Sequence, residues 1–342
     1  MKKFVSIFLF FIIFASLFIS CGQIKTSQSF TAMNTFMTVT LYSSSEKIGR
    51  EVCSQIQNRI QELENILSTT LKTSDVYYIN HNKKFPEPLK PELSELLIFC
   101  NNMYTKTDSS FNPALYPIIR EWGFTTEEYK IPSEQRIKEL LLHTDYSSLC
   151  ESGFIPGAKI DEKMELDFGA VGKGLAADES VAILEKNGIT SALLDFGGNI
   201  QTVGKKPDGS LWRVGIKNPW GTGAVCALNV NSKAVVTSGG YERFFEDEKG
   251  HRYIHIFDPK TGRPCEGNLE SVTIICSSGK YADTLSTALF VMGKDSAVEW
   301  WRKNPDFDFI ILTKDRELFY SEGLKGFIEP VFEFESVELV HR

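Results

Sequence analysis

Apolar residues in the first part of the chain recur every three or four positions, which is the spacing of helices that bury one face. Ser45 stands just before one such stripe and is a typical N-cap residue. A second stripe follows Pro91, a residue favoured in the first turn of a helix. A further stripe ends at Gly188, which suits a left-handed cap. The helices expected in this part span residues 46–67, 91–104, 134–142 and 172–186.

Between and after these helices lie short segments in which apolar and polar residues alternate, as in half-buried strands. Turn sequences such as Pro207-Asp208-Gly209 separate them. Strands are expected at 36–42, 191–196, 211–217, 225–230, 234–237, 271–276, 307–312 and 317–320, and helices at 283–292 and 296–302. Helices around a run of antiparallel-type strands predict an α+β fold. We expect a mixed, largely antiparallel sheet core flanked by helices, with a smaller α/β subdomain.

The N-terminus has the pattern of a secretory signal. Lys2 and Lys3 precede an apolar run over residues 4–20 that is at the edge of the length of a membrane span. Cys21 directly follows the small residue Ser20, an arrangement that resembles the cleavage and lipidation box of bacterial lipoproteins. We therefore expect Cys21 to become the lipidated N-terminus. The alternative is an uncleaved anchor helix, which also leaves the body outside the cytoplasm and attached to a membrane.

This signal divides the chain into three parts. Residues 1–20 are the expected signal peptide, residues 21–30 a polar tether, and residues 31–342 the functional domain. The protein is expected to be exported and lipid-anchored, facing the periplasm at the inner membrane. No later segment is apolar over the roughly 18 residues that a spanning helix needs.

Composition excludes several classes of protein. The hydrophobic fraction of 42% is that of a folded chain, so global disorder is excluded. The net charge of −7 and the lack of a basic stripe argue against nucleic-acid binding. The six cysteines besides Cys21 include no C-x-x-C pair, so a structural zinc site is unsupported. An exported protein permits disulfides, but the apolar surroundings of residues such as Cys53 and Cys276 favour buried free thiols.

The segment 165–174 combines three glycines with Lys173, where a strand is expected to lead into a helix. Such a loop exposes backbone N–H groups to an anion, and the helix N-terminus adds a favourable potential. Its spacing matches neither a Walker A loop nor a dinucleotide-binding fingerprint. A tight turn with an exposed lysine explains the segment equally well.

Two further positions offer chemistry. Asp283 and Thr287 are four residues apart, so on a helix they share one face and could hold Mg²⁺ through oxygen atoms. Helix capping by Asp283 with a surface Thr287 is the alternative. His255 is expected on a strand before the turn Asp258-Pro259, where a core or surface histidine is the usual interpretation and a catalytic base is the functional one.

Taken in order, these segments resemble the ApbE family, the FAD:protein FMN transferases or flavin transferases. The resemblance extends from Met33 to about Gly293. Its motifs are Met33-Asn34-Thr35, Ser110-Phe111-Asn112-Pro113 with Trp122-Gly123-Phe124, the segments 167–174, 194–199 and 212–216, Thr237 to Arg243, His255 to Gly262, and Ala282-Asp283 through Thr287-Ala288. Asn112 departs from the pattern, because many relatives carry Asp there. Ala170 falls where relatives vary, so a metal contact there would use its backbone carbonyl.

The resemblance implies an ApbE-like fold and an enzyme that moves FMN from FAD to a threonine or serine hydroxyl of a partner protein, with release of AMP. It implies Mg²⁺ on Asp283, Thr287 and the Ala170 carbonyl, with His255 and Asp283 in catalytic roles. The residues implied to contact FAD are Met33, Asn34, Ser110, Phe111, Asn112, Asp167, Lys173 and Phe257. Subunits of membrane redox complexes are the implied acceptors.

Two other functions remain open at this point. An Mg²⁺-dependent FAD pyrophosphatase would use the same residues with water as the acceptor and would give FMN and AMP. A flavin-binding lipoprotein without chemistry would not need Asp283 and Thr287 as metal ligands.

Overall fold

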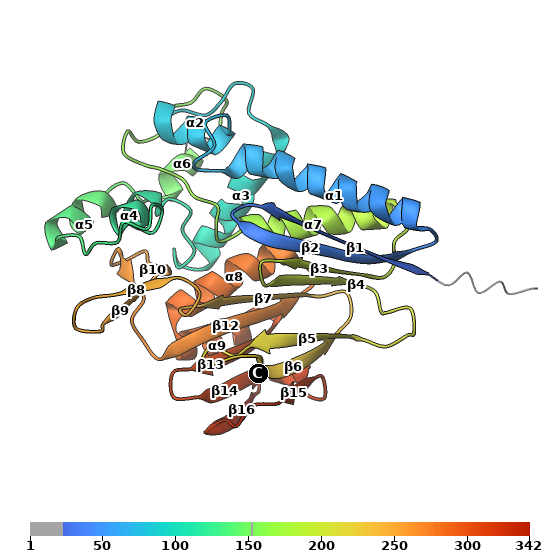
Figure 1. Ribbon diagram of the computed structural model, residues 1–342. Helices are drawn as coiled ribbons and strands as arrows, with labels where there is room; N and C mark the ends of the chain where they lie inside the picture. Colours follow the sequence, from blue (N-terminus) through green and yellow to red (C-terminus); the bar gives the residue numbers. More distant parts are fainter. Residues whose placement is uncertain (1–22, 152) are drawn as a thin grey trace, which may run out of the picture.

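A nine-stranded sheet forms the centre of the computed structural model, which describes residues 23–151 and 153–342 (Figure 1). Its strands, in spatial order, are β1 (Ile24–Ala32), β2 (Thr35–Ser43), β3 (Ala192–Phe196), β4 (Asn199–Val203), β7 (Ala234–Gly239), β12 (Leu269–Cys276), β13 (Asp308–Thr313), β14 (Glu317–Ser321) and β16 (Ser336–Val340). Neighbours are antiparallel except β14 and β16. The expected α+β fold with a mixed, largely antiparallel sheet is confirmed.

The polar tether predicted for residues 21–30 is wrong for most of its length. Residues from Ile24 onward form the edge strand β1, which pairs with β2 along its whole length. Thr26, Phe30 and Ala32 point inward and are buried, whereas the residues between them are largely polar. Because the buried Thr26 and the half-buried Gln28 at inward positions are not apolar, the alternation that marks a strand is hidden in the sequence. Cys21 lies outside the described residues.

Helices cover one face of the sheet. They are α1 (Glu46–Leu67), α7 (Gly172–Lys186), α8 (Gly279–Met292) and α9 (Lys294–Lys303). Ser45 caps α1 as expected, because its Oγ accepts from the N–H of Ile48 at 3.3 Å. In Figure 1 α1 and α7 lie side by side next to β1 and β2, and α8 crosses β7 and β12. The apolar faces of α1, α7 and α8 form the main hydrophobic core with the sheet.

The other face is covered by a small sheet of β5 (Trp212–Lys217), β6 (Ala224–Val230) and β15 (Ile328–Pro330). Trp212 and Leu228 from this sheet pack against Ile275 and Leu312 of the large sheet. A short 3₁₀ helix, Glu322–Leu324, follows β14. Every residue of β12 is buried, because both of its faces are covered.

A helical region and two small hairpins complete the fold at one end (Figure 1). The helices are α2 (Asp75–Asn82), α3 (Pro91–Lys106), α4 (Tyr116–Glu121), α5 (Glu134–Leu141) and α6 (Ser147–Glu151), and the hairpins pair β8 (Phe244–Glu246) with β9 (Arg252–Ile254) and β10 (Phe257–Asp258) with β11 (Arg263–Pro264). Trp122 lies in the hydrophobic cluster shared by these parts and donates from Nε1 to the Gly262 carbonyl at 3.0 Å. This contact fixes the turn that follows His255 in the sequence.

Five cysteines are free thiols, as expected: Cys53, Cys100, Cys226, Cys265 and Cys276. Burial raises the pKa of Cys53 to about 11 and those of Cys226, Cys265 and Cys276 to about 12, so these thiols stay protonated at neutral pH. Within residues 23–151 and 153–342, no helix has both the length and the apolar character needed to cross a membrane.

Candidate functional site

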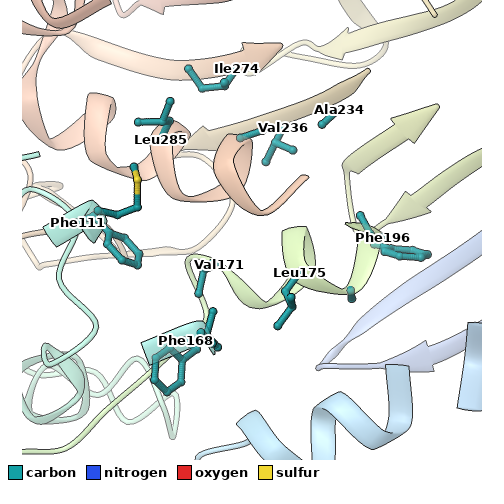
Figure 2. Packing of buried hydrophobic residues seen from close by; sticks show 14 of the residues in the cluster. Phe111, Phe168, Val171, Leu175, Phe196, Ala234, Val236, Ile274 and Leu285 are labelled. Atoms are coloured by element: carbon teal, nitrogen blue, oxygen red, sulfur yellow. The ribbon is translucent and has the colours of Figure 1, made fainter. Parts of the chain in front are cut away.

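The glycine-rich segment 165–174 is a loop held from several sides, and the strand expected at its start is absent. The side chain of Asn80 accepts from the N–H of Leu166 at 2.7 Å and donates to its carbonyl at 2.9 Å. These two bonds take the place of a strand partner, so the segment stays extended outside the sheet. Phe168 and Val171 insert into the main core (Figure 2). The loop is therefore rigid where it enters α7.

Helices α7 and α8 cap each other. The Asp283 carboxylate on α8 accepts from the N–H of Gly174 in the first turn of α7, at 2.8 Å. In return, Asp178 on α7 accepts from the first residues of α8, including the Ser278 hydroxyl at 2.7 Å and the Lys280 N–H at 3.1 Å. Carboxylates at helix N-termini satisfy free N–H groups and favour the helix dipole. The two exchanged caps fix the loop relative to Asp283.

Close approach of the two helices depends on glycine. A Cβ on Gly174 would lie 2.2 Å from the Gly279 carbonyl oxygen and 2.7 Å from the Cβ of Asp283. We expect Gly174→Ala to lower the free energy of unfolding by about 1–3 kcal/mol or more, because backbone must shift to admit the methyl group. Urea unfolding measures this. Gly172→Ala is the control, since its added methyl would meet only Leu67 Cδ1, at 3.9 Å. Equal stability of the two variants would contradict the close-packing argument.

Asp283 is buried inside α8 and does not cap its own helix. Ser278 caps α8, through a bond from the N–H of Tyr281 at 3.2 Å, so the helix that Asp283 caps is α7 and not its own. One Asp283 oxygen is used by Gly174, and the other lies 3.9 Å from the Lys173 ammonium. Thr287, one turn later, is partly exposed, and its hydroxyl contacts that of Ser238 on β7 at 3.1 Å. Asp283 and Thr287 share one face, as predicted.

His255 lies in a bend just after β9, and not on the strand as expected. Its ring Nδ1 is 3.1 Å from the carbonyl oxygen of Arg243, so Nδ1 carries the proton and donates. Nε2 is then left as a proton acceptor. Burial lowers the pKa of His255 to about 4, and the positive charges of Arg243 and Lys173 act in the same direction. The imidazole is therefore neutral and able to accept a proton at physiological pH.

One set of charges connects the three segments singled out in the sequence. Burial raises the pKa of Asp167, while Arg243 and Lys173 oppose that shift. Burial also raises the pKa of Glu242. The positive charge of Lys173 lowers this pKa, and the negative charge of Asp283 raises it further. Lys173 thus acts electrostatically on groups from the glycine loop, from the His255 bend and from α8. This shared field defines the candidate site.

Glu242 and Arg243 were given no role from the sequence, although they belong to the motif from Thr237 to Arg243. The available signal was an acidic and a basic residue next to each other at the end of a strand-and-turn segment. Their contribution depends on the fold, because Arg243 must lie over the His255 bend for its carbonyl to accept from the ring.

The other predicted FAD contacts have structural partners of their own. Met33 and Asn34 form the tight turn between β1 and β2, with φ of 48° and 56°, and the Met33 N–H donates to Glu64 at 2.9 Å. Asn112 uses its amide internally, donating to Thr144 and accepting from the Ala114 N–H. These bonds within the protein do not test whether the residues contact FAD, so their FAD roles stay predictions.

The two phenylalanines implied to contact FAD, Phe111 and Phe257, are buried in the protein. Phe111 is 2% exposed and belongs to the main core (Figure 2). Phe257 packs against Trp122 and Phe124, with ring centroids 5.9 and 5.6 Å apart. Ser110 is partly exposed beside Phe111. A flavin would have to reach Phe111 and Phe257 at the small fraction of their surface that stays open.

The donors near Asp283 suit a hard cation such as Mg²⁺. Asp283 offers one oxygen that accepts no hydrogen bond, Thr287 a hydroxyl, and Ala170 a backbone carbonyl in the turn before α7. Such sites use oxygen ligands and leave positions for water and substrate phosphate. Among the described residues, no group of three or more His, Cys, Asp and Glu side chains is placed to hold a metal. A bound ion would thus rest on one carboxylate and neutral oxygens.

Comparisons with known proteins identify the family that this chain resembles. Residues 33–311 match the model of the ApbE family. An FAD:protein FMN transferase of Klebsiella pneumoniae is 30% identical over 89% of this chain and 94% of its own length. One from Treponema pallidum is 34% identical over 78% of each chain. The crystal structure of the ApbE protein of Thermotoga maritima superposes with a TM-score of 0.80 at 30% identity, covering 89% of this chain and 99% of that one.

Proposed function

The chain belongs to the ApbE family and is an FAD:protein FMN transferase, and on that premise we propose how its residues carry the transfer. In our proposal the acceptor is a threonine or serine hydroxyl of the partner protein. Its oxygen bonds to the phosphorus of the FMN half of FAD, the bond between the two phosphates breaks, and AMP leaves. The reaction is assisted by Mg²⁺.

The glycine loop and Lys173 bind the diphosphate. The ammonium of Lys173 is partly exposed and adds positive charge at the N-terminal end of α7, where helix amides favour anions. Asp283, Thr287 and the Ala170 carbonyl would hold Mg²⁺, which supplies Lewis-acid stabilisation of charge on the phosphates. Asp167 lies next to the loop and is placed to accept from hydroxyl or amino groups of the nucleotide.

His255 accepts the proton of the incoming hydroxyl at Nε2. The Arg243 carbonyl holds the ring in the required tautomer, because it binds the Nδ1 proton. Such positioning of a neutral imidazole is what a general base needs. Burial keeps the free imidazole neutral before the reaction by lowering its pKa, and the Arg243 and Lys173 charges act in the same direction.

The observation that supports this proposal most is the common electrostatic environment of Lys173, His255 and Asp283. An FAD pyrophosphatase would use the same groups with water. Incubating the full-length protein with FAD, Mg²⁺ and a candidate acceptor separates the possibilities. Covalent flavin on the acceptor, visible by in-gel fluorescence, is expected. Free FMN alone would favour the hydrolase, and unchanged FAD would favour a binding protein.

The proposal includes export and a lipid anchor at the periplasmic face of the inner membrane. It also takes a subunit of a membrane redox complex as the acceptor, because an anchored enzyme and a membrane-bound substrate meet at the same surface. The support for the anchor is the apolar run that ends at Ser20-Cys21.

Replacing Cys21 with serine is expected to abolish processing, because the thiol is the atom that would carry the lipid. The precursor should accumulate uncleaved, as seen by its larger size on a gel and by mass spectrometry of the N-terminus. Cys53→Ser, at a buried thiol within α1, is a control that should leave processing unchanged. Cleaved Cys21→Ser protein that still enters the detergent phase would contradict the lipoprotein assignment.

A further inference from the structure

A cavity of about 700 Å³ lies beside the candidate site. Its volume is within the range of about 300–1,000 Å³ that is usual for ligand pockets. Its lining mixes apolar residues with charged ones of both signs, and includes Ile254, Asp258, Leu269, Glu270, Met292 and Lys314. None of the residues assigned above to FAD or Mg²⁺ lines it. The cavity is therefore available to another part of the reaction.

Glu270 is the unusual residue of this cavity. It sits at an irregularity of β12, where the pairing with β13 shifts between Leu269 and Ser271. Bulges of this kind redirect a side chain and occur often next to active sites. Glu270 is only 9% exposed, but its carboxylate oxygens are not among the fully buried unpaired atoms, so they face the cavity. Within the described residues this carboxylate makes no hydrogen bond and no ion pair. A ligand in the cavity can therefore donate hydrogen bonds to these oxygens in place of water, and bonds to a charged acceptor are stronger than those to a neutral one.

The charges around Glu270 indicate which donors are missing. Arg252 and Lys314 act on the carboxylate as positive charges from a distance, and both line the cavity. The carboxylate therefore has compensating charge nearby but no direct partner. What it lacks are hydrogen-bond donors, which the backbone N–H groups and hydroxyls of a polypeptide supply without adding charge.

The cavity adjoins the catalytic segments on two sides. Ile254 and Asp258 line it and flank His255 in the sequence, and Gly240 lines it just before Glu242 and Arg243. The N–H of Gly240 donates to the Glu270 carbonyl at 3.2 Å, which ties the bulge to that segment. A chain bound in the cavity would thus pass close to the proposed base.

We propose that this cavity binds the segment of the acceptor protein that carries the reacting hydroxyl, and that Glu270 accepts hydrogen bonds from its backbone amides or hydroxyls. The inference rests on the proposed function and adds to it the place where the protein substrate docks. FAD approaches from the side of Lys173, and the acceptor approaches from the side of Glu270. His255 lies between the two.

Steady-state kinetics with a protein acceptor test this. Membranes of the source organism are first incubated with the full-length enzyme, FAD and Mg²⁺. The protein that becomes fluorescent in a denaturing gel is then purified and serves as the acceptor. We expect Glu270→Leu to raise KM for this acceptor about tenfold to a hundredfold, as for a lost bond to a charged group. Glu270→Gln keeps one acceptor oxygen and should give a smaller rise. FAD affinity, from quenching of flavin fluorescence, should stay the same.

The controls separate the possible failures. Glu338→Leu replaces an exposed glutamate on β16 and should change neither quantity. Thermal melting should show Glu270→Leu close in stability to the wild type, because the carboxylate makes no hydrogen bond or ion pair that the change would break. An unchanged KM in Glu270→Leu would overturn the inference while leaving the transferase intact. Equal losses of FAD affinity and acceptor affinity would also overturn it. If the wild type labels no protein, the proposed function itself fails.

Discussion

The variant Asp283→Asn is expected to transfer FMN at least about a hundred- to a thousandfold more slowly than the wild type, the usual cost of removing a charge-stabilising group. Asp283 is the one carboxylate among the proposed metal donors, and its oxygen near Lys173 accepts no hydrogen bond. The amide keeps the shape and still accepts from the Gly174 N–H, so α7 and α8 stay capped. The loss therefore reports on charge and not on folding.

Two measurements and a control variant check this result. Calorimetry should show weaker binding of Mg²⁺ to Asp283→Asn, and EDTA should stop transfer by the wild type. Asp208→Asn is a control, because that carboxylate also accepts a backbone N–H, from Ser210 at 2.9 Å, in a turn away from the site. A folded Asp283→Asn protein that transfers FMN at the wild-type rate, or wild-type transfer that resists EDTA, would refute the proposed mechanism.

The second large effect is expected for His255→Gln. Transfer should fall by about a hundred- to ten-thousandfold, the range found when a general base is removed. FAD should still bind, since the diphosphate contacts come from Lys173 and the loop. Rapid mixing of enzyme-bound FAD with the acceptor measures the chemical step alone. Wild-type single-turnover rates in His255→Gln would assign the proton transfer to another group.

The pKa of His255 also fixes the pH dependence. Its folded pKa of about 4 lies below the ordinary value of 6.5, so only the unfolded chain takes up this proton between those values. The contribution of His255 to stability is complete above about pH 6.5 and declines as the pH falls towards 4. Likewise, loss of the base should appear near pH 4 in the rate profile. The free energy of unfolding should fall less between pH 6.5 and 4 in His255→Gln than in the wild type. A loss of activity near pH 6.5 that is absent in His255→Gln would contradict the assigned pKa.

Local signals predicted α1, α3, α5, α7, α8 and α9, but not the short helices α2, α4 and α6. The Ser45 cap and the apolar stripe after it gave the bounds of α1 within a residue, and Gly188 adopts the left-handed conformation expected after α7. Most strands of the large sheet were also found, but β4 and β16 were not. The edge strand β1 was missed because Thr26 is buried at an inward position. The two small hairpins were missed because strands of two or three residues are too short to show an alternation of apolar and polar positions.

The site could be predicted only as separate pieces. The sequence places Asp283 and Thr287 on one face, since four residues of a helix suffice for that inference. It does not show that Asp283 binds the N–H of Gly174, which is 109 residues away. Nor does it show the lowered pKa of His255, which depends on burial by segments distant in sequence. The redirected side chain of Glu270 has the same origin, because a bulge is defined by the strand opposite it.

The exchanged caps between α7 and α8 have a thermodynamic consequence. Asp178 and Asp283 hold the glycine-rich loop and the proposed metal donors as one rigid unit before any substrate arrives. Binding of FAD then orders few residues, so little conformational entropy is lost when the complex forms. The affinity gained by such preorganisation is available at low FAD concentration. The enzyme is thereby suited to a compartment in which the dinucleotide must be captured when it is scarce.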